Sequence, residues 1–122
     1  MRPEEFYLRD IILACKSAID FVGSISREFF NASDLYQSAV LFKLMIIGEA
    51  ASQISPHLKS RHTHVDWQSL KGFRNIIAHE YFSLNQDIVW NSATDDAVIL
   101  IPQIIDILST EVPEFPLPSE WK

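Results

Sequence analysis

Apolar positions recur at helical spacing along most of this chain. In the first stretch they fall three or four residues apart, at positions 8, 11, 12, 15, 18, 19, 22 and 25. Such spacing places one apolar stripe along a helix. It predicts a first helix over residues 3–29, with Pro3 in the first helical turn, where its missing N–H costs nothing. Ser33 or Asp34 is then suited to cap the next helix.

A second helix is predicted over residues 35–54. Its centre, residues 39–51, is apolar on nearly every side, and a helix of that kind is buried on every side. In a chain this short, we expect a second subunit to cover part of that surface. Small residues at Gly48 and Ala51 favour a close approach of another backbone. Residues 55–56, Ser-Pro, are predicted to end the helix.

The segment 57–65 is polar and is predicted to be a loop. Asp66 follows as a good N-cap for a third helix, which is predicted to end near Tyr81. Residues 83–86 are predicted to form the next turn.

A fourth helix is predicted from residue 87 to about residue 108, with a kink at Pro102. The tail, residues 112–122, contains three prolines and is predicted to be extended. Helices joined by short connections predict an all-α fold, an antiparallel bundle of four to five helices in a single domain spanning residues 1–122.

Composition narrows the function classes. Of the 122 residues, 48% are hydrophobic and only three are glycine, which argues against a turn-rich all-β fold. The formal net charge is −6, so the chain as a whole is not built to coat nucleic acid, and RNA contact would need a local cluster of cations.

Cysteine content and hydropathy bear on the expected location of the protein in the cell. Cys15 is the only cysteine, which excludes an intrachain disulfide, and its place on the apolar stripe predicts core packing. The charged N-terminus shows no signal peptide, and the apolar runs are too short to span a membrane. We therefore expect a cytoplasmic protein with no membrane partner.

Candidate chemistry is concentrated in the run Arg74-Asn75-Ile76-Ile77-Ala78-His79-Glu80-Tyr81. Arginine is suited to gripping a phosphate, and histidine to moving protons near neutral pH. RNA carries its own nucleophile, the 2′-hydroxyl, so a histidine and an arginine can cleave it without a metal. In a purely structural interpretation, the arginine pairs with Glu49 or Glu80, the histidine sits at a helix end and the tyrosine packs.

Helix geometry separates the two principal candidates. Asn75 and His79 are four residues apart and share one helix face, so Asn75 could orient the histidine. Arg74 points roughly 140° away from His79, at about 100° per residue. A dimer that pairs this helix about a two-fold axis would bring two arginines and two histidines into one cleft. Glu49, a charge in an apolar helix, either pairs with Arg74 or lies at a solvent-facing edge.

Two other groups of side chains are candidates for a metal site and for an RNA-steering surface. His57, His62 and His64 are a weak metal candidate, because closed sites usually need four ligands and only Asp66 is at hand. A modest basic cluster surrounds the third helix, either as a solvated loop or as a surface that steers RNA towards the cleft. Its members are Lys59, Arg61, Lys71 and Arg74.

The run from Arg74 to Tyr81 resembles the Arg-x4-His-x-Tyr motif of the HepT-like toxins, which belong to the HEPN superfamily of helical ribonucleases. The likeness extends to Ile47-Gly48-Glu49-Ala50, to Trp67, and to Asp87-Ile88-Val89-Trp90. It spans the chain from the first helix to the fourth and covers the proline-rich tail least.

The resemblance implies a dimerising helical bundle with Arg74 and His79 of both subunits as catalytic residues in a shared cleft. It implies a metal-independent endoribonuclease that needs no cofactor and acts as the toxin of a prokaryotic toxin–antitoxin pair. Its partners would be RNA, a second copy in a homodimer or higher-order complex, and an MntA-like nucleotidyltransferase antitoxin. That antitoxin would transfer AMP to Tyr81. The alternative is a non-catalytic helical module that binds a nucleotidyltransferase or a nucleotide.

Overall fold

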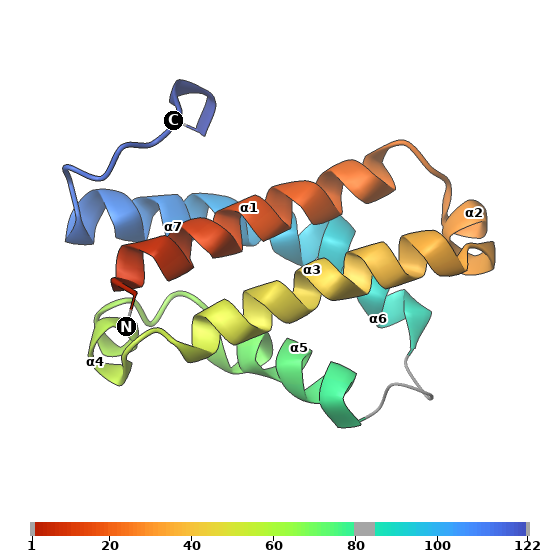
Figure 1. The fold of residues 1–122 in the computed structure, drawn as a ribbon, viewed down its shortest axis with the longest axis horizontal. Helices are drawn as coiled ribbons and strands as arrows, with labels where there is room; N and C mark the ends of the chain where they lie inside the picture. Colours follow the sequence, from red (N-terminus) through yellow and green to blue (C-terminus); the bar gives the residue numbers. More distant parts are fainter. Residues whose placement is uncertain (1, 80–84, 122) are drawn as a thin grey trace.

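The computed structural model describes the backbone of residues 2–79 and 85–121, and the side chains of these residues except 75–79. Every regular element in these ranges is helical, which confirms the expected all-α bundle. Four long elements form the bundle, and Figure 1 shows that successive ones run in opposite directions. They are α1 (Glu4–Gly23), α3 (Asp34–Ser52), α5 (Trp67–His79) and α7 (Ala97–Glu111).

The first helix is shorter than predicted. Instead of one helix over residues 3–29, α1 ends at Gly23 and a separate helix, α2 (Arg27–Ala32), follows. Ser26 begins α2, since its side chain accepts a hydrogen bond from the backbone N–H of Phe29. A serine cap of this kind satisfies a helix-start N–H that has no partner within the helix, so it fixes a new helix rather than prolonging the old one.

Helix α3 lies close to its predicted position. Ser33 caps it as expected, by accepting a hydrogen bond from the N–H of Tyr36. One side of α3 enters the core, with Val40 and Leu44 buried against α1. The other side is not covered within the described chain, because Leu35 is 75% exposed and Phe42 is 53% exposed. Burial of that side by a second subunit stays a prediction.

The predicted loop over residues 57–65 is wrong in its first half. A short helix, α4 (Pro56–Arg61), forms there, with Pro56 in its first turn. The side chain of Ser55 accepts a hydrogen bond from the N–H of Leu58 and caps it. The Ser-Pro pair that was expected only to end the preceding helix therefore also begins the next one.

The predicted fourth helix is observed as three consecutive segments. Helix α6 (Gln86–Asn91) is capped by Asn85, whose side chain accepts a hydrogen bond from the N–H of Asp87. A π-helical segment, η2 (Ser92–Asp96), leads into α7, which contains Pro102. The π-helical segment thus lies before Pro102 along the chain, and the kink expected at Pro102 itself stays a prediction. The predicted turn at residues 83–86 lies partly outside the described residues.

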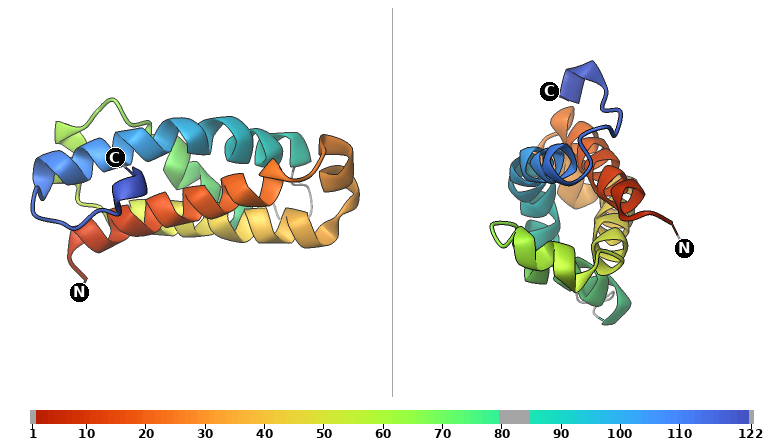
Figure 2. Two further views of the ribbon diagram at one scale, coloured as in Figure 1. Left: turned by 90° about the horizontal axis from the view of Figure 1, so that it is seen from above. Right: turned by 90° about the vertical axis from the view of Figure 1, so that its left-hand side faces the viewer.

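The core lies where α1 meets α3 and α7. Cys15 is fully buried there, as predicted, and burial raises the pKa of its thiol to about 12. Figure 2 shows the C-terminal segment crossing back over the bundle. Its Phe115 ring contacts the Phe6 ring edge to face, and Trp121 lies in the short 3₁₀ helix η3 (Ser119–Trp121). The tail is therefore folded against α1 and not wholly extended.

Within residues 2–79 and 85–121, no helix combines the length and apolar character that crossing a membrane requires.

Candidate functional site

Helix α5, which carries the motif, is fixed at its first turn. Asp66 caps it as predicted: its Oδ1 accepts from the N–H of Ser69 at 3.2 Å, and its Oδ2 accepts from the Ser69 hydroxyl at 2.6 Å. The indole of Trp67 donates to the carbonyl of His62 at 2.9 Å. Because Asp66 caps the first turn and Trp67 is hydrogen-bonded to the preceding loop, the direction of α5 is set before the motif begins.

A close approach of α3 and α5 places Arg74. A Cβ added at Gly48 would lie 2.8 Å from the backbone nitrogen of Arg74 and 3.0 Å from the carbonyl oxygen of Leu70. Only glycine fits that spacing, because real Cβ contacts are longer and both facing atoms belong to the backbone. The backbone of Arg74 is therefore pressed directly against α3.

The side chain of Arg74 forms an ion pair with Glu49, the residue after that glycine. Its Nε lies 2.9 Å from Oε2 of Glu49. Both sequence interpretations of Glu49 hold at once, since the carboxylate is paired and 52% exposed. The Arg74 side chain is 54% exposed, and the five N–H donors of its guanidinium exceed what one carboxylate can accept. Arg74 is thus held in place with donors to spare for a ligand.

The pair lies in a groove formed by the start of α1, the second half of α3 and the middle of α5. The groove has a volume of about 410 Å³, within the range of small-ligand sites. Its lining combines apolar side chains with two arginine–carboxylate pairs. The lining residues are Arg2, Tyr7, Asp10, Met45, Ile46, Glu49, Ala50 and Arg74.

No pattern in the sequence links the start of α1 with the motif on α5. Arg2, Tyr7 and Asp10 precede the motif by half the chain and form no pattern with it. Only the antiparallel packing of α1 on α3 brings them near Arg74. Arg2 precedes a helix start that carries carboxylates, but arginines in such positions are too common in proteins to predict a binding site.

The other predicted site residues are placed only in part. Asn75 and His79 lie in α5, which ends at His79, but their side chains are outside the described residues. Tyr81, the predicted AMP acceptor, also lies outside them, as does Glu80, the second possible partner of Arg74. The structure therefore brings Glu49 and Arg74 together, while the predicted relation of Arg74 to His79 stays a prediction.

Of the three histidines considered as metal ligands, His62 forms a contact with a carboxylate instead. His62 is buried and its Nε2 lies 2.7 Å from Oε2 of Glu111, at the end of α7. Asp66 is engaged in capping α5. Among the residues that the structure describes, no three His, Cys, Asp or Glu side chains are grouped so as to hold a metal ion.

The basic cluster is also divided among separate contacts. Arg61 donates to Glu111 through Nε at 3.1 Å and Nη2 at 2.6 Å. The ammonium of Lys59 lies 5.7 Å from the centre of the Trp67 ring. Burial, with a smaller contribution from Lys71, lowers the pKa of Lys59. Of the four residues, Arg74 is the one that lines the groove.

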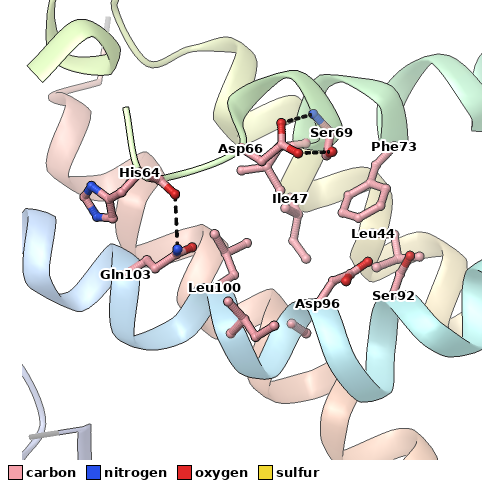
Figure 3. Close-up of a pocket in the computed structure, with 13 residues that line it drawn as sticks. Leu44, Ile47, His64, Asp66, Ser69, Phe73, Ser92, Asp96, Leu100 and Gln103 are labelled. Carbon is pink, nitrogen blue, oxygen red and sulfur yellow. Dashed lines mark hydrogen bonds between the residues drawn. The ribbon is translucent and has the colours of Figure 1, made fainter. Parts of the chain in front are cut away.

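A second cavity, of about 190 Å³, lies on another side of α5, towards η2 and α7 (Figure 3). Its floor is apolar, and Phe73, the residue before Arg74, lines it together with Leu44 and Leu100. Asp96 lies at its edge, where burial and the nearby charge of Asp95 raise the pKa of its carboxyl group. Among the described residues that line this cavity, none is a predicted catalytic or supporting residue, whereas Arg74 and Glu49 line the groove.

Comparison with known proteins places this geometry in a family. The sequence profile of the family described as Ribonuclease HepT-like matches residues 11–110. A protein named "Putative RNase" from Caldanaerobacter subterraneus subsp. tengcongensis is 32% identical over 111 residues, which are 91% of this chain and 99% of that protein. One named "Probable ribonuclease HepT" from Thermococcus cleftensis is 30% identical over 95 residues, 78% of this chain and 86% of that protein.

A further relative from Methanocaldococcus jannaschii, also named "Putative RNase", is 30% identical over 95 residues, covering 78% of this chain and 87% of its own. No solved structure gives a significant match. The profile match covers the elements that build the groove from α3 to α5 and includes the whole motif. The chain therefore belongs to the HepT-like family of HEPN ribonucleases.

Proposed function

We propose that this chain is a metal-independent endoribonuclease whose catalytic residues are Arg74 and His79. The observation that carries the proposal is the state of Arg74. Its backbone is fixed against Gly48, its side chain is held by Glu49, and its guanidinium is still half exposed in a groove. A cation that is both positioned and accessible is what stabilisation of a charged transition state requires. Membership of a ribonuclease family supplies the substrate class.

The proposed reaction uses the nucleophile that RNA carries. The 2′-oxygen attacks the adjacent phosphorus, the bond from phosphorus to the 5′-oxygen breaks, and the products are a 2′,3′-cyclic phosphate and a 5′-hydroxyl. One His79 takes the 2′-hydroxyl proton and another, from a second subunit, protonates the departing oxygen. Arg74 donates to the phosphoryl oxygens as their charge grows. Each proton and each bond is accounted for without a metal.

Two supporting roles accompany this reaction. Glu49 limits the positions that the Arg74 side chain can adopt, since an ion pair at 2.9 Å opposes rotation of the long arginine stem. Asn75, four residues before His79 on α5, is proposed to orient the imidazole or to bind a phosphate oxygen.

The proposal is tested with purified protein and RNA in excess EDTA. Cleavage is expected for the natural chain, and His79→Ala should abolish it while circular dichroism and Tm stay unchanged. Unchanged cleavage by the purified variant would remove His79 from the mechanism. Cleavage that requires added metal would contradict the metal-independent reaction.

We further propose that the enzyme is the toxin of a toxin–antitoxin pair, works as a homodimer, and is silenced by transfer of AMP from ATP to Tyr81. In that step the Tyr81 hydroxyl oxygen attacks the α-phosphorus of ATP, pyrophosphate leaves and the hydroxyl proton is released. A bulky phosphodiester two residues after His79 would repel an RNA phosphate from the same site. After incubation with a partner nucleotidyltransferase and ATP, mass spectrometry should find an AMP adduct on Tyr81. Neutralised toxicity with no adduct would mean that the antitoxin acts by binding alone.

A second candidate function is a non-catalytic binding module. The groove favours it to this extent: two arginines and apolar side chains can bind a nucleotide with no chemistry. The EDTA experiment separates the two functions. Absence of RNA cleavage at every protein concentration, together with measurable nucleotide binding, would support the module.

A further inference from the structure

The groove contains a second arginine that none of the proposed chemistry uses. Arg2, just before α1, lines the groove from the α1 side, whereas Arg74 lines it from α5, and both helices pack on α3. Its Nη1 is 2.7 Å from Oδ2 of Asp10, and its Cζ lies 4.7 Å from the centre of the Tyr7 ring. A carboxylate and an aromatic face thus restrain this guanidinium from two directions. Its side chain is nevertheless 46% exposed.

The two ion pairs that line the groove repeat one arrangement. In each pair a helix supplies a carboxylate, Asp10 from α1 or Glu49 from α3, that holds an arginine at 2.7 or 2.9 Å. Both arginine side chains are about half exposed. Two restrained cations that open into one groove match a ligand with two separated anionic groups.

The rest of the groove lining has a different chemistry. Met45 and Ile46 are partly exposed on α3, the helix on which both α1 and α5 pack, and with Ala50 they supply an apolar part of the groove lining. A nucleoside has flat apolar faces and is flanked by phosphates in an RNA strand. Single-stranded RNA is commonly bound in this manner, with cations on the backbone and apolar or aromatic side chains under the bases.

We propose that Arg2 binds a second phosphate of the RNA strand, next to the phosphate held at Arg74, and that the nucleoside between them lies over Met45 and Ile46. This inference rests on the proposed function and adds a substrate-binding residue to it. Arg2 touches no reacting bond, so it sets affinity for substrates that carry the flanking phosphate. A chain with a net charge of −6 needs such local cations to hold a polyanion.

The test uses a minimal substrate series. One dinucleotide contains a single cleavable linkage. Two trinucleotides extend it by one nucleotide at the 5′ or the 3′ side, with a 2′-deoxy sugar that leaves only the original linkage cleavable. The natural protein should cleave one trinucleotide with a kcat/KM about tenfold higher than the dinucleotide, through a lower KM. A neutral methylphosphonate at the flanking linkage should remove that advantage.

Arg2→Gln should lose the preference for the trinucleotide, so that the ratio of its kcat/KM on the trinucleotide to that on the dinucleotide falls to about one. Arg2→Lys should keep part of the preference, because the charge remains and the planar fork is lost. Arg9→Gln is the matched control. Arg9 is an arginine of the same helix start, 4.0 Å from Asp10, and is outside the set of described residues that line the groove. A preference that persists in Arg2→Gln, or that falls equally in Arg9→Gln, overturns the inference.

A binding experiment keeps this inference separate from the proposed function. The same series with 2′-O-methyl sugars cannot be cleaved, and its affinity is measured by titration at several salt concentrations. Arg2→Gln should weaken only the trinucleotide and reduce its salt slope by about 0.7. If natural protein and variant bind both lengths equally, Arg2 does not bind the flanking phosphate. If binding behaves as expected but no RNA is cleaved, the inference stands and the nuclease proposal fails.

Discussion

Two glutamates of this molecule each hold an arginine, and they do so in opposite ways. Glu111 is 19% exposed and receives three contacts, two from Arg61 and one from His62, at 2.6 to 3.1 Å. These contacts lower the pKa of its carboxyl group to about 2, and the hydrogen bond from Arg61 contributes more than that from His62. Glu49 is 52% exposed, and its closest approach to Arg74 is a single 2.9 Å contact.

The difference separates a structural contact from a binding site. The Glu111 cluster joins the end of α4 to the last residue of α7, and its acceptor atoms are occupied. In this cluster the carboxylate of Glu111 is 19% exposed and its oxygens are already engaged, so it links two helices, although Arg61 itself is 42% exposed. The Glu49–Arg74 pair fixes one cation beside a groove and keeps it accessible. We expect substitutions in the first to change stability and substitutions in the second to change RNA cleavage.

The largest expected effect comes from removing the two arginines separately. Arg74→Ala should lower kcat for RNA cleavage by about 100- to 1,000-fold, the usual loss when one donor to a charged transition state is removed. Its Tm should change little, because the exposed pair contributes little to stability. Arg61→Ala should do the reverse, with a lower Tm and cleavage within about twofold of natural. Similar losses of cleavage in both variants would erase the distinction.

The next effect concerns the close approach of α3 and α5. Gly48→Ala would place a methyl group 2.8 Å from the Arg74 backbone nitrogen, so the helices must separate. We expect a loss of about 1–3 kcal/mol in the free energy of unfolding, the range for overpacking, together with a clear fall in cleavage at permissive temperature.

Gly72→Ala is the control for that substitution, measured by urea unfolding and by cleavage rate. It lies on α5, and its added Cβ would meet no described atom within 4 Å. It should be neutral or stabilise the fold by up to about 1 kcal/mol, since alanine favours a helix over glycine. Equal destabilisation by both substitutions would mean that Gly48 matters through helix propensity and not through contact with α5.

A smaller effect should appear in the pH dependence of stability. The Glu111 carboxyl has its pKa lowered from 4.5 to about 2, so its contribution is complete above about pH 4.5 and is lost as pH falls towards 2. Glu111→Gln should therefore be less stable than the natural chain at pH 7, by about 1 kcal/mol. That difference should shrink below pH 4.5. Urea unfolding at a series of pH values measures it, and a gap that stays constant down to pH 2.5 would contradict the assigned cause.

The smallest effect is expected from Glu49→Gln. The variant loses the charge that competes with an RNA phosphate, yet its amide oxygen can still accept from Arg74. RNA affinity should rise by about two- to threefold, because exposed charges are screened, and kcat should fall modestly as Arg74 gains freedom. Titration with a 2′-O-methyl oligonucleotide and single-turnover cleavage measure the two quantities. A fall in affinity would instead show that the Glu49 charge helps to bind RNA.

Much of the fold could be predicted from the spacing of apolar residues, because α1 and α7 repeat them at helical spacing for several turns and α3 is one long apolar run. The six-residue helices α2 and α4 escaped it, since so few positions establish no period. Their starts depend on Ser26 and Ser55, whose capping role is local chemistry that the wider pattern hid. The π-helical turn of η2 could not be predicted either, because it adds only about one residue to a helical turn and so barely changes the spacing of apolar residues.

The site was predicted as far as local sequence allows. Glu49 was expected either to pair with Arg74 or to lie at a solvent-facing edge, and it does both, since it pairs with Arg74 and is 52% exposed. Gly48 was expected to permit a close backbone approach, and the approach is that of α5. Arg2 could not be found in this way, because it reaches the groove only through packing of α1 on α3.

The central claim is that the groove at Arg74 cleaves RNA with the 2′-hydroxyl as nucleophile and without metal. The most direct measurement is single-turnover cleavage, in EDTA, of an oligonucleotide with one ribose in a 2′-deoxy background, with mass analysis of both products. The account predicts a 2′,3′-cyclic phosphate and a 5′-hydroxyl, with no cleavage of the all-deoxy strand and none by Arg74→Ala. Cleavage of the all-deoxy strand, or full cleavage by Arg74→Ala, would contradict it.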